Sequence, residues 1–478
     1  MKKILFLLAI ALGFSSCQNW LNINQNPNTP TDVPASLILP QAEAGLAVRV
    51  GGNLFNTGGF FVQYWEQAPE ANQYNNLSIF NLTAEYFNND YSELYSVLNN
   101  VEQVRNQATA SGDWGDYLAG TVIRAYTFQV IVDAIGDAPY KEAIQGSANF
   151  QPHYDSGDTI YAGILSELDD ALSKVSSASS SSVYSTDMLC GGSLSQWIGF
   201  ANALKLKILM RESNVKDVSS QVMSLINQNN FFTGNIEFAT FSDEAGKRNP
   251  WYETNKIGLA ANNHVASYTF VASMANDSRL KAIFDTVADG TFKGIIAGSE
   301  HDGTKKTANY SLPIFRATAP VYLYTQAELQ FFIAEAQDRW GDKTKAKAAY
   351  ESGIDNAFSL WGLDGSSTYA AGGIYAWNDS NALPLIYIQK WLSLAGINPY
   401  EAWCEQRRTG YPQFDPDLGT AIVATPTLYV PYDLITPTRT TLNAGQMIQR
   451  LYYPQVSTSR NPNAPAQKTL VTPIFWHK

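Results

Sequence analysis

Apolar residues recur at helical spacing along most of this chain. Across residues 83–111 they return every three or four positions and stop at Gly112, a residue type that often ends helices. The run Trp114–Ile135 has the same period, and a third run opens at Asp158 or Thr159. The pattern therefore predicts successive amphipathic helices that pack on one another.

Two further helices are predicted to begin with a capping box. In this motif, the first residue and the residue three positions later satisfy backbone amides that the helix leaves free. Ser193 with Gln196 precedes one apolar run, and Thr325 with Glu328 precedes another. Strand patterns are few and short, and they cover residues 232–241, 428–432 and 447–453. The chain is thus predicted to be mainly helical.

One segment has the spacing of a tetratricopeptide repeat. Small residues such as Ala334 and Gly353 would let two antiparallel helices approach closely, while Tyr350 fills the space beside them. The same Gly-Asp turn stands at 136–137 and 341–342, which suggests several such pairs. We predict a stacked, right-handed helical scaffold of tetratricopeptide type. The repeat positions are Ile333, Ala334, Gly341, Ala346, Tyr350 and Gly353.

Three stretches do not follow the helical period. Residues 55–81, 230–316 and 362–381 are rich in Gly, Asn, Tyr and Trp. Loops of this length in a compact protein are usually functional or disordered, and aromatic content argues against disorder. We expect these stretches to form long irregular loops that carry the ligand site.

The N-terminus has the pattern of an export signal. Lys2 and Lys3 precede eleven apolar residues, which are too few to span a bilayer as a helix. Small residues then precede Cys17, as in a bacterial lipobox. We expect a signal peptide over 1–16, a lipid on Cys17, a tether over 17–33 and a single domain over 34–478. The alternative is an ordinary secreted protein with a chance cysteine at this place.

Composition narrows the possible chemistry. The chain has 11 Trp, 26 Tyr and 23 Phe but only 4 His and 3 Cys, too few ligands for zinc ribbons or iron–sulfur proteins. We therefore expect no cofactor, although a metal in a loop stays open. The net charge of −11 repels phosphate backbones, so no nucleic acid partner is expected. Cys190 and Cys404 are interpreted as buried thiols in preference to a disulfide.

The sequence contains no motif of a common hydrolase or nucleotide-binding site. It has no Gly-x-Ser-x-Gly elbow, no P-loop and no His-Glu-x-x-His. A glycosidase needs only two carboxylates, and 43 acidic residues leave that alternative open. Amides and aromatic rings nevertheless outnumber acids in the irregular stretches. They favour a protein that binds a sugar without cleaving it.

The irregular stretches contain the residue types that bind sugars. A sugar ring packs its apolar C–H face on an indole or phenol, while its hydroxyls need partners such as Asn. For each ring the competing interpretation is burial in the core. The candidate ligand-binding residues are Trp65, Tyr74, Asn75, Trp251, Tyr252 and Trp377.

Longer motifs carry a resemblance to a known family. They are VDAIGDAPYKEA (132–143), SQWIGFANALKLKILMR (195–211), QKWLSLAGINPYEAWCEQRRTGYP (389–412) and RLYYP (450–454). With the cysteine at the end of the export signal, they make the chain similar to SusD/RagB-type outer-membrane lipoproteins over nearly its full length.

The resemblance implies a SusD-like helical-repeat fold and a lipid-anchored, surface-exposed protein of the outer membrane. Such proteins are not enzymes. They bind oligosaccharides, or in some members peptides or another nutrient, and deliver them to a SusC-like TonB-dependent outer-membrane transporter. Trp391, Trp403, Arg407 and Arg408 lie on helical spacing within the matching motifs, and they are more plausible as core and ion-pair residues than as ligand contacts.

Overall fold

The structure is a computed structural model that describes residues 33–179, 181–299, 303–314, 316–415, 425, 428–443 and 445–477. The expected signal peptide, the lipid attachment site Cys17 and the tether up to residue 32 lie outside the described residues.

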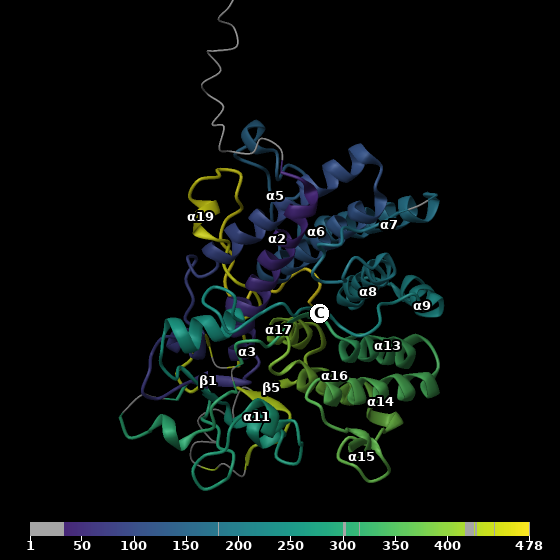
Figure 1. Cartoon of the computed structure of the whole chain (residues 1–478). Helices are drawn as coiled ribbons and strands as arrows, with labels where there is room; N and C mark the ends of the chain where they lie inside the picture. Colours follow the sequence, from purple (N-terminus) through teal and green to yellow (C-terminus); the bar gives the residue numbers. More distant parts are fainter. Residues whose placement is uncertain are drawn as a thin grey trace, which may run out of the picture.

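Helices form one side of the molecule and irregular segments the other. Figure 1 shows α7, α8, α9, α13 and α14 following one another down one side, opposite a region that contains β1 (Trp65–Gln67) and α11 (Tyr268–Ser273). The longer helices are α2 (Ala35–Arg49), α5 (Asn88–Ser111), α6 (Trp114–Ile135), α7 (Gly157–Ser177), α8 (Leu194–Glu212), α9 (Ser219–Gln228), α13 (Gln326–Trp340), α14 (Lys343–Ser359), α16 (Ala382–Leu394) and α17 (Pro399–Thr409). The mainly helical, tetratricopeptide-like prediction is confirmed.

Local signals fixed the ends of several helices. The hydroxyl of Ser193 accepts from the amide of Gln196 at 3.4 Å, and the hydroxyl of Thr325 accepts from the amide of Glu328 at 3.1 Å, so both predicted caps form. Gly112 ends α5 in the left-handed region, where a glycine is least strained. The prediction for 83–111 was too long, because residues 84–87 form turns before α5.

The predicted repeat pair is α13 and α14. Ala334 and Tyr350 are fully buried between the two helices and their neighbours. A Cβ atom on Gly353 would lie 2.6 Å from Cε1 of Phe331, so only glycine permits this approach of the helices. The spacing had predicted this close approach.

Short strands join segments that are distant in sequence. The strand β1 (Trp65–Gln67) pairs antiparallel with β3 (His264–Ala266), and Trp65 lies opposite Ala266. Two other sheets pair β2 (Ile236–Phe238) with β4 (Val321–Tyr324), antiparallel, and β5 (Gln413–Asp415) with β6 (Asp433–Ile435), parallel. The first sheet therefore links two of the irregular stretches.

Some local expectations were wrong. The strand expected over 232–241 shortens to β2, and neither 428–432 nor 447–453 is a strand. In the last of these segments, the amide of Leu451 donates to the carbonyl of Ala134, and that of Gln449 donates to Leu470. Its apolar residues therefore pack on the end of α6 without a neighbouring strand. Likewise, the start of the stretch 55–81 is a helix, α3 (Phe55–Phe61).

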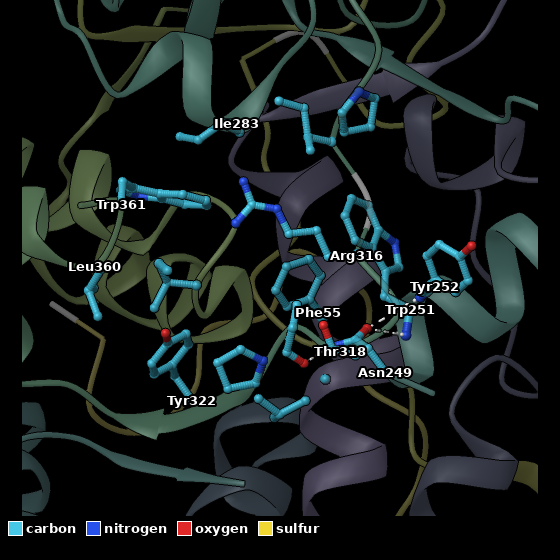
Figure 2. Close-up of a pocket in the computed structure, with 18 of the residues that line it drawn as sticks. Phe55, Asn249, Trp251, Tyr252, Ile283, Arg316, Thr318, Tyr322, Leu360 and Trp361 are labelled. Carbon is cyan, nitrogen blue, oxygen red and sulfur yellow. Dashed lines mark hydrogen bonds between the residues drawn. The ribbon is translucent and has the colours of Figure 1, made fainter. Parts of the chain in front are cut away.

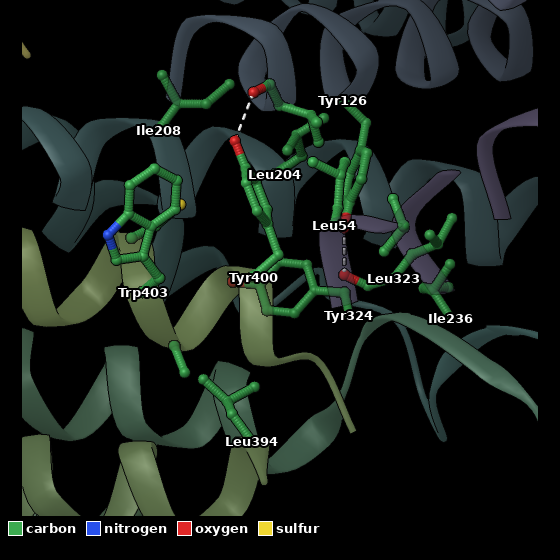
Figure 3. Close-up of a cluster of buried hydrophobic side chains, with 14 of the residues drawn as sticks. Leu54, Tyr126, Leu204, Ile208, Ile236, Leu323, Tyr324, Leu394, Tyr400 and Trp403 are labelled. Carbon is green, nitrogen blue, oxygen red and sulfur yellow. Dashed lines mark hydrogen bonds between the residues drawn. The ribbon is translucent and has the colours of Figure 1, made fainter. Parts of the chain in front are cut away.

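The core brings aromatic rings from several helices together (Figure 3). Tyr126 of α6 donates its hydroxyl to the carbonyl of Leu323 at 2.9 Å, and Tyr400 of α17 donates to that of Val130 at 2.7 Å. These bonds satisfy buried hydroxyls that would otherwise destabilise the core. α6 is long and apolar enough to cross a membrane, but its most apolar 18 residues are all buried, as in the core helix of a folded domain.

A cluster of buried charges lies between α6, α8, α13, α16 and α17. Nη2 of Arg211 lies 2.8 Å from Oε1 of Glu401, and Nζ of Lys207 lies 2.7 Å from Oε1 of Glu328. Nζ of Lys390 is 2.9 Å from Oε2 of Glu405. We call these residues, with Asp133, Glu335 and Arg408, the buried ion cluster.

Residues of the long C-terminal motif are structural, as the sequence suggested. Trp391, Trp403 and Arg407 are at most 2% exposed, and the guanidinium of Arg407 stacks 3.5 Å from the centre of the Trp403 ring. Arg408 donates from Nη1 to Oε1 of Glu335 at 2.7 Å. Cys404 is buried, Cys190 is partly buried, and both are free thiols.

Candidate functional site

An aromatic pocket lies at the meeting point of the irregular segments. Its cavity of about 220 Å³ is lined by residues from several separate parts of the sequence, between Gly51 and Ile397. Figure 2 shows Trp361 on one side and Trp251 with Tyr252 on the other, with Phe55 and Arg316 between them in this view. We call this the aromatic pocket, and its argued lining is Phe55, Trp251, Tyr252, Arg316, Tyr322 and Trp361.

A helix cap positions the wall made by Trp251 and Tyr252. Oδ1 of Asn249 accepts from the amides of Trp251 at 3.0 Å and Tyr252 at 3.3 Å, which begins the short helix α10 (Pro250–Tyr252). Nδ2 of Asn249 donates to the carbonyl of Ala319 at 2.9 Å. One buried amide side chain therefore holds both rings against the turn that carries the rest of the lining.

Trp65 supports this wall from behind. Its ring stacks on that of Trp251 at 4.8 Å between centroids, and on Phe55 at 5.5 Å. A Cβ on Gly59 would lie 2.0 Å from Cζ2 of Trp65, so the indole packs directly on the backbone of α3. Only 1% of Trp65 is exposed, which leaves almost no surface for a sugar. Trp65 orients Trp251 and Phe55 by stacking.

Trp361 forms the opposite wall just after α14. It is half-buried, and a Cβ on Gly396 would lie 3.3 Å from its ring. Tyr322 of β4 is half-buried beside it, and burial raises the pKa of its hydroxyl to about 12. Tyr322 therefore remains a neutral phenol at physiological pH. The two walls offer aromatic faces across one cavity.

The structure separates the other predicted residues from this pocket. The hydroxyl of Tyr74 donates to Oδ1 of Asn255 at 2.7 Å, in a second cavity of about 260 Å³ that Trp251 also lines. Oδ1 of Asn75 accepts from Nη2 of Arg439 at 2.9 Å. Trp377 packs on Tyr350 and donates to Asp379 at 2.6 Å. The described lining of the aromatic pocket therefore contains Trp65, Trp251 and Tyr252 but not Tyr74, Asn75 or Trp377.

Sequence reasoning missed four of the six argued lining residues, namely Phe55, Arg316, Tyr322 and Trp361. Trp361 stands one residue before the irregular stretch 362–381, and Arg316 is the last residue of the stretch 230–316, so the stretch boundaries held a usable signal. Tyr322 has no such signal, whereas Phe55 is the first residue of the stretch 55–81. They belong to a strand and a helix, and only the tertiary fold brings them to the cavity.

Two buried ionisable groups flank Trp65. Burial raises the pKa of Glu66 to about 8 and lowers that of His264 to about 3, so both are mainly uncharged at pH 7. Glu66 accepts a short hydrogen bond from the hydroxyl of Ser78, and His264 contacts the rings of Trp65 and Trp251. The support behind the pocket is therefore mainly uncharged at pH 7.

Other concavities differ in chemistry. A groove of about 770 Å³ lies along α7, α8 and α9, but its described lining has no aromatic residue. The aromatic pocket has no Asp or Glu among its described lining residues. Aromatic faces suit stacking on a sugar ring, whereas the usual glycoside hydrolysis uses two carboxyl groups beside the bond.

Known proteins resemble this chain in sequence and in fold. Residues 27–454 match the model of a SusD-like family described as starch-binding and associating with the outer membrane. Comparison with curated proteins gives no match.

Among solved structures, a SusD homolog from Bacteroides uniformis is 21% identical, with a TM-score of 0.71 over 94% of this chain and 100% of that one. A SusD/RagB family protein from Bacteroides thetaiotaomicron gives 21% and 0.75 over 93% and 99%. A chitin-binding SusD homolog from Flavobacterium johnsoniae gives 19% and 0.73 over 92% and 98%. At these identities the likeness establishes the fold.

Proposed function

Because the chain belongs to the SusD-like family, we propose that it captures oligosaccharides in the aromatic pocket and delivers them to a SusC-like TonB-dependent transporter in the outer membrane. The family is described as starch-binding and as associating with that membrane, and two similar structures are named as chitin-binding. These descriptions of the family and of similar structures support glycan binding as the role of this chain.

One observation carries the proposal for this chain. Trp361 lies opposite Trp251 and Tyr252 across a cavity of about 220 Å³ (Figure 2), so aromatic rings, on which a sugar can stack, line both sides of the cavity. The walls are held before any ligand arrives, by Asn249 on one side and by Trp65 behind it. A preformed wall loses little conformational entropy on binding.

Affinity electrophoresis through gels that contain a panel of polysaccharides tests this proposal. We expect at least one glycan to retard the protein, and Trp361→Ala to abolish most of the retardation because one stacking face is lost. Stacking of a nucleic-acid base on an aromatic side chain is worth about 1–3 kcal/mol, and we expect a loss of the same order for a sugar on Trp361. Trp114→Ala is the matched control, since Trp114 is a half-buried ring at the start of α6, remote from the pocket lining.

Trp377→Ala should be measured in the same gels. Trp377 stood among the predicted ligand residues and lies outside the pocket, so a loss of retardation in this variant would reveal a second platform. Unchanged mobility of the wild type with every glycan would contradict the proposed function.

The membrane anchor is part of the proposal. The pattern before Cys17 supports lipid attachment at that residue. We expect Cys17→Ser to move the protein from the membrane fraction to the soluble fraction without changing glycan retardation. Copurification with an outer-membrane barrel after mild solubilisation would support the transporter partner. An unchanged membrane fraction in Cys17→Ser would exclude this anchor.

A further inference from the structure

The aromatic pocket contains a cation that the fold does not neutralise. Arg316 lines the cavity and is exposed, and Figure 2 shows its guanidinium extending toward the side of Trp361. Among the described arginines, only Arg316 and Arg460 have a guanidinium without a hydrogen bond or ion pair. Arg460 lies elsewhere, beside Ser457.

The rest of the pocket offers no negative charge to pair with Arg316. Its described lining includes no Asp, Glu or Gln. Its one amide, Asn249, already accepts from two backbone amides and donates to a carbonyl, so it has little capacity left for a ligand. The other polar side-chain groups of the described lining are hydroxyls, indoles and the guanidinium.

This composition is rich in donors and poor in acceptors. A guanidinium has five N–H donors and no acceptor, whereas each hydroxyl of a neutral sugar both donates and accepts. A carboxylate or sulfate only accepts, and a guanidinium can bind it through two parallel hydrogen bonds. Such a charge-assisted pair is stronger than a hydrogen bond between two neutral groups.

The net charge of the whole chain would not attract an anionic ligand to this pocket. The chain has net charge −11, so its surface as a whole repels polyanions. An anionic ligand would bind here against that background, through a local cation between aromatic faces.

We propose that the aromatic pocket selects oligosaccharides that carry anionic groups, carboxylate or sulfate, and that Arg316 is its specificity-determining residue. The inference rests on the proposed function and names the substrate class of the same site. The rings hold the sugar through its C–H faces, and Arg316 holds the acidic substituent.

Isothermal titration calorimetry with paired polysaccharides tests this inference. The acidic members are polygalacturonate, alginate, hyaluronan and dextran sulfate. Their neutral partners are the methyl-esterified forms of the first three and plain dextran. We expect at least one acidic member to bind about tenfold or more tightly than its neutral partner, and the advantage to shrink as salt is added. Comparison of the carboxylated polysaccharides with dextran sulfate shows which anionic group the pocket binds.

Arg316→Gln should remove this advantage, with a loss of about tenfold or more for the acidic glycan and little change for its neutral partner. Arg316→Lys keeps the positive charge but loses the two parallel N–H donors of the guanidinium, so it should retain only part of the affinity for the acidic glycan. Arg460→Gln is the matched control, because it removes the same charge from an exposed, unpaired arginine outside the pocket.

The outcomes separate this inference from the proposed function. If neutral glycans bind in a manner that depends on Trp361, and acidic partners bind no better, the inference falls and the proposed function stands. Equal losses in Arg316→Gln and Arg460→Gln would also overturn it. If no polysaccharide binds, both fall, and Arg316-dependent binding of poly-glutamate in their place would assign the pocket to acidic peptides.

Discussion

Trp65 and Trp361 belong to the same pocket but have different roles. Trp65 is 1% exposed and stacks on two other rings, whereas Trp361 is half-buried and presents a face to the cavity. Both stand in or beside irregular stretches, and neither has a sequence environment that reveals its burial. Trp251 and Tyr252 could be predicted as a pair of adjacent rings, because a Pro and an Asn mark the turn before them.

Glu66 is a residue whose charge state depends on burial. Burial raises its pKa to about 8, so between about pH 4.5 and pH 8 the folded chain holds a proton that the unfolded chain releases. Stability from this group is complete below about pH 4.5 and is lost as the pH rises to about 8. Glu66→Gln cannot titrate and should keep that stability.

The melting temperatures of Glu66→Gln and wild type should therefore diverge as the pH rises. We expect the variant to gain a few kcal/mol relative to wild type between about pH 5 and pH 8, at about 1.4 kcal/mol per pKa unit. Glu70→Gln, an exposed carboxylate on the same segment, should not show this growing difference. A constant difference between Glu66→Gln and wild type across the pH range would refute the raised pKa.

At the scale of elements, sequence signals worked where the cause is local. The bounds of α6 matched the prediction, because Gly136 stops it and Asp113 caps it. The caps at Ser193 and Thr325 formed for the same reason. The strand prediction for 447–453 was wrong because this segment packs on the end of α6, which is distant in sequence, and not on a neighbouring strand.

The contact between α13 and α14 gives a test at this scale. Gly353→Ala would improve helix propensity by about 1 kcal/mol, yet its Cβ would meet the Phe331 ring at 2.6 Å. Overpacking typically costs about 1–3 kcal/mol, so we expect a net loss of stability in urea denaturation. Ser352→Ala, on the neighbouring half-buried position, should be neutral or slightly stabilising. A Gly353→Ala variant more stable than wild type would contradict the close approach.

Across the whole molecule, the buried ion cluster joins helices from both ends of the chain. Glu405 of α17 contacts Arg211 of α8, Lys390 of α16 and Arg408, and although burial opposes ionisation, these cations hold its pKa well below the usual range. The sequence placed Arg408 in an ion pair but could not name its partners. They come from helices that only the tertiary fold brings together.

Removal of one charge from this cluster should destabilise the entire fold. Glu405→Gln leaves three buried cations without a shared partner, and breaking a buried pair typically costs about 3–5 kcal/mol. We expect a lower melting temperature in a single calorimetric transition. Glu244→Gln breaks an exposed pair with Lys247 and should shift stability by less than about 1 kcal/mol. A second transition in Glu405→Gln would mean that the two ends of the chain unfold separately.

The positions of the pocket residues along the sequence decide which truncated chains can bind a glycan. The described lining residues of the aromatic pocket are spread from Gly51 to Ile397, so a chain growing from its N-terminus has no complete pocket until residue 397 has been made. Fragments truncated earlier could not compete with the finished protein for glycan. Retention on a glycan column would thus sort full-length chains from premature termination products without any tag.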